Sequence, residues 1–169
     1  MAIHETARFS NVVRSVCNYI KTSLEGAAGL PTKFPAANIW WPGHAFDTDK
    51  VSYYLRAHFI DDEGKYFSRV EGSNGGSLKR PRLFMDVFIK HDHARSQNNA
   101  YILEDTLDIV KSYFLNNSGI EVTNYQGSGV TSLGKVWVRG RQPNAPKDDK
   151  WLSGGFMISL EWIEQDAAA

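Results

Sequence analysis

Apolar and polar side chains alternate along four stretches of the chain, at residues 51–60, 82–90, 135–139 and 155–163. In the first stretch every odd-numbered residue is apolar or aromatic, whereas the even-numbered residues are mostly polar and include Arg56. A period of two is typical of a half-buried strand, because successive side chains leave a pleated backbone on opposite sides. We therefore predict a strand over each of these four stretches.

Two other stretches repeat apolar residues at steps of three and four, which is the period of an amphipathic helix. The first covers residues 4–25 and is followed by Gly26, a residue that favours the end of a helix. The second covers residues 96–116, with Ser96 as the expected N-cap and an Asn-Ser-Gly segment after its end. The sequence thus predicts two main helices.

Two long segments show neither the two-residue period of a strand nor the period of an amphipathic helix. Residues 61–80 begin with Asp-Asp-Glu-Gly and contain a run rich in glycine and serine, and residues 142–149 are polar and contain two prolines. Glycine and serine in such numbers make a segment flexible, and a long excursion of this kind inside a small protein is usually functional or disordered. We predict that residues 61–80 form a flexible arm.

The order of these elements is helix, strands, helix, strands. A chain of 169 residues can bury a core as one domain, and we assign residues 1–169 to a single one. The predicted fold is α+β, with a single antiparallel or mixed sheet of about four or five strands, two helices packed on one face, and long loops.

The charge balance, the cysteine count and the length of the apolar runs each argue against some classes of protein. Nineteen basic and nineteen acidic residues give a formal net charge of zero, which argues against a protein that coats nucleic acid or an anionic membrane. The single cysteine, Cys17, excludes an internal disulfide and is expected to be a buried core residue. No apolar run is long enough to span a bilayer, so a cytoplasm-like compartment is expected.

The strongest candidate for catalytic chemistry is His91-Asp92-His93. If these residues continue the strand before them, both histidines point the same way and could share a metal with His58 or His44. A small metal-dependent enzyme is therefore one alternative. Polar residues are also ordinary at the end of a strand, and the glycine-rich segments lack the context of a hydrolase elbow or a phosphate loop. We predict no catalytic residue, no metal site and no cofactor.

Two basic clusters have aromatic neighbours. Lys79, Arg80 and Arg82 lie close together in the sequence, as do Arg139 and Arg141. Such clusters can bind nucleic acid, which is a further alternative. The balanced charge of the whole chain favours a solvated or subunit-facing role instead.

The order of particular segments resembles a known family. An Ile-Trp-Trp-Pro-Gly-His-Ala-Phe segment at 39–46 precedes a Tyr-Leu-Arg at 54–56 within the first long strand. A glycine-rich loop, a Leu-Phe-Met-Asp-Val-Phe-Ile strand at 83–89 and an apolar helix at 103–114 follow. This arrangement is similar to the tail terminator proteins of long-tailed bacteriophages, also called tail completion or head–tail joining proteins. The closest match is Trp-Pro-x-x-x-Phe followed by Tyr-Leu-Arg, although Gly43 stands where family members commonly have asparagine.

The resemblance implies a virion structural protein and not an enzyme. Such a protein forms a hexameric ring on the finished tail tube, stops tube polymerisation and offers a docking surface to the head connector. Its expected partners are further copies of itself, the tail tube protein and a head-side connector or stopper protein. It would meet DNA only as DNA passes through the ring lumen, with no membrane partner. It would be assembled in the host cytoplasm and reside at the neck of the tail. Another neck protein, such as a stopper, is the nearest alternative.

A ring closes through a head-to-tail interface, so its two contact surfaces must differ. Aromatic residues on the outward side of the second strand are expected at these contacts, because aromatic side chains dominate interface energetics. Basic residues of the arm are expected at the polar interface or in the lumen. The interface residues that we predict are Trp40, Trp41, Arg69, Lys79, Arg80, Phe84 and Phe88.

Overall fold

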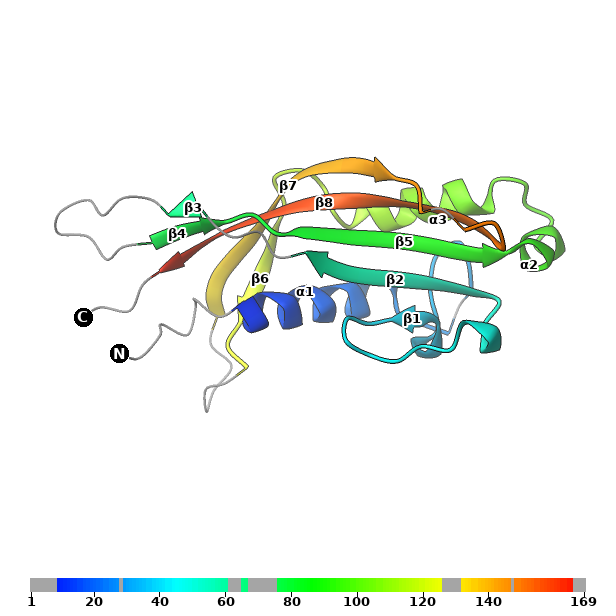
Figure 1. Cartoon of the computed structure of the whole chain (residues 1–169), viewed down its shortest axis with the longest axis horizontal. Helices are drawn as coiled ribbons and strands as arrows, with labels where there is room; N and C mark the ends of the chain where they lie inside the picture. The colour runs from blue at the N-terminus through cyan, green and yellow to red at the C-terminus, as the bar shows by residue number, and fades with distance from the viewer. Residues whose placement is uncertain are drawn as a thin grey trace.

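One curled mixed sheet forms the body of the protein in its computed structural model, which has the shape of a half-barrel (Figure 1). The structure describes residues 9–27, 29–60, 65–66, 76–125, 132–146 and 148–165. The helices are α1 (Phe9–Leu24), α2 (His91–Ser96) and α3 (Ile102–Ser112), with short 3-10 helices η2 (Ala36–Asn38) and η3 (Thr48–Lys50). The strands are β1 (Ile39–Trp40), β2 (Tyr53–Ile60), β3 (Lys65–Tyr66), β4 (Gly76–Lys79), β5 (Arg82–Lys90), β6 (Gly119–Thr123), β7 (Ser132–Asn144) and β8 (Trp151–Gln165).

The main sheet is organised around β8, the longest strand. β5 pairs with one side of β8 and β7 with the other, and β2 and β6 extend the sheet outward from these two strands. β1 is parallel to β2, whereas the other strand pairs are antiparallel. The last part of β8 continues past β5 and pairs with β4, which pairs in turn with β3. This second group of strands projects from one end of the molecule (Figure 1).

Alternation along the strands gives the sheet two different faces. Leu55 of β2, Val87 of β5 and Leu160 of β8 lie on one face, and each is fully buried. They share one hydrophobic cluster with residues of both main helices, including Ile20 of α1 and Val110 of α3. The predictions of an α+β fold, a single mixed sheet and two main helices are confirmed.

The predicted number of strands is too small. Within the described residues the sheet has eight strands, of which β1 and β3 contain two residues each. β7 and β8 are also longer than the stretches predicted at 135–139 and 155–163. Gly154 precedes the predicted start of the last strand and Gly155 is that start, and both lie inside β8, where each glycine leaves room for a neighbouring element. A Cβ on Gly154 would lie 2.9 Å from Cδ1 of Leu107, so α3 can approach the sheet closely at this point.

The helix predicted over 96–116 is divided in the structure. α2 begins at His91 and ends at Ser96, whose hydroxyl donates to the carbonyl of His93 and caps no following helix. Asn98 then adopts a positive φ of 50°, a conformation that asparagine tolerates better than most residues. The side chain of Asn99 accepts a hydrogen bond from the backbone N–H of Tyr101 just before α3 begins. These asparagines end one helix and position the next.

The arm predicted over 61–80 is partly strand, because it contains β3 and β4. Residues 61–64 and 67–75 lie outside the described residues, as do the first residues of the helix predicted over 4–25. None of the helices in the described part of the chain is both long and apolar enough to cross a membrane.

The first helix also covers the edge of the sheet at β6. Ser15 and Asn11 are buried polar residues of α1. The hydroxyl of Ser15 accepts a hydrogen bond from the N–H of Thr123 at 2.9 Å, and the side-chain oxygen of Asn11 accepts one from the N–H of Tyr125 at 3.3 Å. Because these backbone groups are satisfied within the chain, α1 makes this edge unsuitable for pairing with another strand.

Candidate functional site

The candidate functional site lies on the outer face, which we define as the face of the sheet opposite α1 and α3. This face is built from the alternate residues of β2, β5 and β8 that point away from the helices. Part of it is covered by the segment around β1 and η3, and part is open to solvent. These two parts have different chemistry.

The covered part is a cluster of five aromatic side chains. Tyr54 stacks on Phe88 with ring centroids 4.6 Å apart and meets the edge of Trp151 at 5.2 Å. Phe46 lies 5.1 Å from Tyr54 and stacks on Trp40 at 5.5 Å. Burial raises the pKa of Tyr54 from its ordinary value of 10.0 to about 12. This outer aromatic cluster fixes the β1 segment to the sheet.

The position of Phe88 corrects a sequence prediction. Phe88 was predicted at a subunit contact because it lies on the outward side of β5. Its side chain is only 2% exposed, since Tyr54 and Trp151 cover it. Phe88 therefore stabilises the fold from within this cluster and has almost no surface to offer a partner.

An ion pair is buried beside the outer aromatic cluster. Nη2 of Arg56 lies 2.7 Å from Oδ2 of Asp86, whose side chain is fully buried. The side-chain amide of Asn144 donates to the other carboxylate oxygen, also at 2.7 Å. The guanidinium lies between the faces of Trp40, at 5.8 Å, and Phe88, at 5.1 Å. Gly155 makes room for this pair, because a Cβ there would collide with the carboxylate of Asp86.

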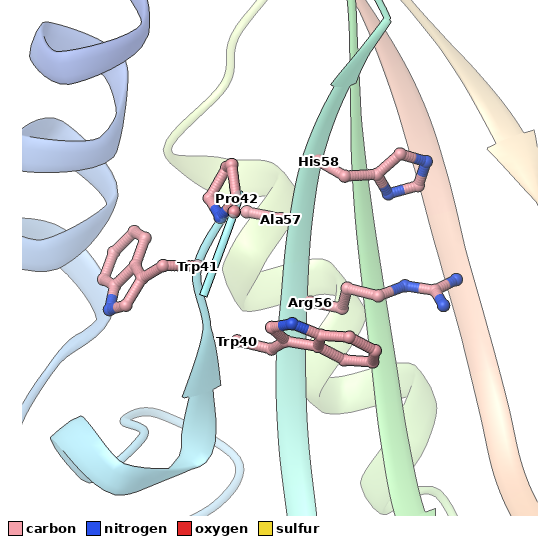
Figure 2. A pocket seen from close by; sticks show the side chains of 7 residues that line it. Trp40, Trp41, Pro42, Arg56, Ala57 and His58 are labelled. Atoms are coloured by element: carbon pink, nitrogen blue, oxygen red, sulfur yellow. The ribbon is translucent and has the colours of Figure 1, made fainter. Parts of the chain in front are cut away.

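An open pocket of about 310 Å³ lies where the β1 segment meets β2. Figure 2 shows Trp40, Arg56 and His58 extending to one side of the ribbon and Trp41 to the other. The chain leaves β1 through a tight turn in which Gly43 has a positive φ of 74° and the N–H of His44 donates to the carbonyl of Trp41. The groups lining this pocket are apolar, aromatic or basic, a combination that suits an aromatic or acidic side chain of a partner.

His58 at the rim of this pocket is held neutral. Its ring stacks on Phe84 at 4.7 Å, and its Nδ1 is buried without a hydrogen-bond partner among the described residues. Burial, and secondarily the positive charge of Arg56, lower the pKa of His58 below its ordinary value. Phe84 is half-buried by this contact and retains some accessible surface.

The open part of the outer face is basic. We call it the basic strip and define it by Arg80, Arg82, Lys135, Trp137 and Arg139. The side chains of Lys135 and Arg139 lie over the ring of Trp137, at 5.9 and 5.5 Å, and Trp137 is 37% exposed.

One carboxylate, that of Glu161, forms hydrogen bonds to arginines from both sides of the basic strip. Glu161 of β8 accepts hydrogen bonds of 3.0 Å from both Arg80 and Arg139. Partial burial alone would raise the pKa of Glu161, but the hydrogen bonds from these two arginines lower it below its ordinary value. Glu161 is therefore ionised at neutral pH and fixes both guanidinium groups above the sheet.

The other predicted interface residues are spread over the molecule. Trp40 lies in the outer aromatic cluster, whereas Trp41 packs against the main core. Lys79 is half-buried in β4, Arg80 is exposed in the basic strip, and Arg69 lies outside the described residues. The sequence prediction did not include Trp137, and it did not anticipate that Glu161 joins two basic clusters. The alternation of Lys-Val-Trp-Val-Arg was the signal for Trp137, since it places the indole beside two cations on one face.

The histidine pair does not have the geometry of a shared metal site. His91 and His93 begin α2 instead of ending a strand, and residues two apart on a helix point about 200° away from each other. The ring of His93 packs against Tyr53 at 4.9 Å, and His91 lines a separate open pocket of about 430 Å³. Within the described ranges, no group of three or more His, Cys, Asp or Glu side chains is placed to hold a metal ion.

No family model matches the chain, and no curated protein matches its sequence. The fold therefore defines the class to which the protein can be assigned, an α+β protein with a half-barrel sheet.

Proposed function

We propose that this chain is a structural subunit of a long-tailed bacteriophage that closes the tail tube as a ring. In this role it ends tube polymerisation and presents a docking surface to the head-side connector or stopper protein. It works without catalysis or cofactor, is assembled in the host cytoplasm and remains at the neck of the virion. DNA meets the ring only while it passes through the lumen.

The observation that carries this proposal is the packing of the segments that resemble the tail terminator family. Phe46 of the Trp-Pro-x-x-x-Phe segment lies 5.1 Å from Tyr54 of the Tyr-Leu-Arg segment. Arg56 of that segment pairs with Asp86, and Tyr54 stacks on Phe88; Asp86 and Phe88 both belong to the matching strand at 83–89. Residues that carry the resemblance thus form one structural unit, which gives a physical reason for their occurrence together in a sequence.

The distribution of accessible surface also supports an assembling subunit. Both main helices contribute to the core on one face of the sheet, and the opposite face carries an open pocket and the basic strip. A ring subunit needs two unlike contact surfaces, and a sheet covered by helices on one face offers them. The metal-dependent alternative has lost its geometric basis, because His91 and His93 diverge on a helix.

Tail tube elongation provides the decisive experiment. Tube protein is polymerised alone and with a small amount of this chain, and tube lengths are measured by electron microscopy. We expect elongation to stop at substoichiometric amounts, with a ring density at one tube end. A stopper protein would bind only tubes that are already closed and would leave their lengths unchanged. The proposal is wrong if the chain neither binds tube ends nor changes tube length.

A further inference from the structure

We infer that the basic strip is the docking surface for helix α3 of a second copy of this chain. The inference rests on the proposed function, because it names the two surfaces through which ring subunits would meet. It is argued from the exposure, charge and position of these two surfaces.

The basic strip carries an excess of positive charge on an accessible surface. Arg80 and Arg139 are 60% and 41% exposed, and they share the single carboxylate of Glu161, which is 18% exposed. Lys135 and Arg82 are also exposed. Glu121 lies directly across from Lys135 on the neighbouring strand and offsets part of the charge. Since the strip has four cations and these two carboxylates, it retains a net charge of about +2.

The solvent-facing side of α3 has the opposite charge. Glu104, Asp105 and Asp108 are exposed, and the helix packs on the sheet through other residues. Lys111, which is 3.3 Å from Asp108, is the basic residue of this helix. Tyr101 stands immediately before the helix and is 69% exposed. This surface combines an acidic helix face with an uncovered aromatic ring, the counterpart of cations arranged around Trp137.

The two surfaces lie on opposite sides of the sheet. Leu107 of α3 approaches Gly154 from the core side, whereas Trp137 and Glu161 point to the outer side. One copy can therefore present its acidic helix to the basic strip of the next, and the same contact can repeat around a ring. The eleven residues of α3 span about 16 Å, which is close to the width of three neighbouring strands, about 14 Å.

Charge and aromatic area have separate roles in this contact. Exposed ion pairs contribute little binding free energy each, but opposite surface charges direct the encounter and fix the orientation of the subunits. Trp137 and Tyr101 provide the apolar area, because aromatic rings bury much surface with few rotatable bonds. A chain of zero net charge that carries two opposite patches is suited to binding its own copies.

The test uses charge reversal on the full chain. Variant A carries Arg80→Glu and Arg82→Glu, and Glu161 retains its bond to Arg139. Variant B carries Glu104→Lys and Asp108→Lys. The matched control carries Lys21→Glu and Lys150→Glu, which reverses two exposed lysines that belong to neither defined surface and gives the same net charge as variant A. Circular dichroism establishes that each variant is folded before its assembly is measured.

Association is measured by analytical ultracentrifugation at low salt and by counting rings on tail tubes. We expect the wild type and the control to assemble, and variants A and B alone to associate at least about tenfold more weakly. In a mixture of A and B, the unchanged helix of A meets the unchanged strip of B, and the reversed helix of B meets the reversed strip of A, so assembly of alternating copies should be restored. Combining all four reversals in one chain should restore assembly.

Three results would overturn the inference. The first is assembly of variants A and B at the level of the control, and the second is a wild type that does not self-associate in either assay. The third is binding of short duplex DNA by the wild type that variant A abolishes while ring formation remains intact, since nucleic acid would then occupy the strip. The tube-length assay is read independently. If the protein stops tube elongation but the charge reversals do not change its association, the proposed function stands and the inferred contact is wrong. If the protein leaves tube elongation unchanged, the proposed function is wrong.

Discussion

The ion pair between Arg56 and Asp86 allows the energetics of the outer face to be tested quantitatively. The carboxylate of Asp86 is fully buried and holds two hydrogen bonds, whereas the side chain of Arg56 is 31% exposed. Removing one member of such a pair leaves the other without its counter-charge. The cost must therefore depend on which member remains, because water can still reach the arginine but not the aspartate.

We expect Asp86→Ala to lower the free energy of unfolding by about 2 kcal/mol, since solvent partly compensates the remaining guanidinium. Arg56→Met keeps an unbranched side chain between Trp40 and Phe88 but isolates the buried carboxylate, so the expected loss is about 4 kcal/mol. For a protein of this length, that loss lowers the melting temperature by about 8–16 °C. The double variant should lose only about 3 kcal/mol, which gives a coupling free energy of about 3 kcal/mol.

Urea unfolding followed by tryptophan fluorescence measures these quantities, and Trp40 reports directly on the cluster because Arg56 lies against its ring. An unchanged m-value establishes that the variants alter stability and not the surface exposed on unfolding. Additive losses, with a coupling below about 0.5 kcal/mol, would refute the reasoning. So would an Asp86→Ala variant less stable than Arg56→Met, because the asymmetry of burial would then not control the cost.

Three further predictions use the same unfolding assay or a simple reactivity assay. Gly155→Ala should cost about 2–3 kcal/mol, because its Cβ would lie 2.6 Å from the carbonyl oxygen of Met85, whereas Gly140→Ala faces open space and should be nearly neutral; equal effects would contradict this. The pKa of His58 is lower in the folded chain, so the unfolded chain binds more protons below the ordinary value of 6.5. Stability should therefore fall as pH drops below that value, and His58→Gln should weaken the dependence, unlike a His44→Gln control. Cys17 is half-buried, not a fully buried core residue as predicted, and this burial raises the pKa of its thiol to about 11, so Ellman's reagent should react more slowly with the folded than with the unfolded chain; equal rates would contradict this.

Much of the fold could be predicted from periodicity. The alternation at 51–60 and 82–90 predicts β2 and β5 closely, because both strands bury one face against a continuous core. The break between α2 and α3 could not be predicted in the same way. Residues 95–99 are all polar, a pattern that an exposed helical turn and a break share, and the chain turns at Asn98, whose backbone conformation leaves only a weak signal in the sequence.

The chemistry of the outer face was harder to predict than the core. Side-chain alternation assigns Phe84 and Phe88 to the same face, but it does not reveal that Phe88 alone is buried in a cluster with Tyr54 and Trp151, against which the segment around β1 packs. That arrangement depends on contacts of Trp40 and Phe46 with residues of other strands. The joining of Arg80 and Arg139 by Glu161 likewise depends on the pairing register of β8, which local patterns do not specify.

β8 explains how a small protein can have two such different faces. Gly154 and Gly155 are successive residues, so their missing side chains lie on opposite sides of the sheet. The first allows α3 to approach the core face, and the second allows the Asp86 carboxylate to be buried on the outer face. The helix layer and the polar network are thus fixed at the same point of one strand, while the basic strip lies further along it at Glu161. A change that moves β8 by one residue would exchange the two faces, because strand residues alternate. The separation of an acidic helix surface from a basic sheet surface therefore depends on the register of β8.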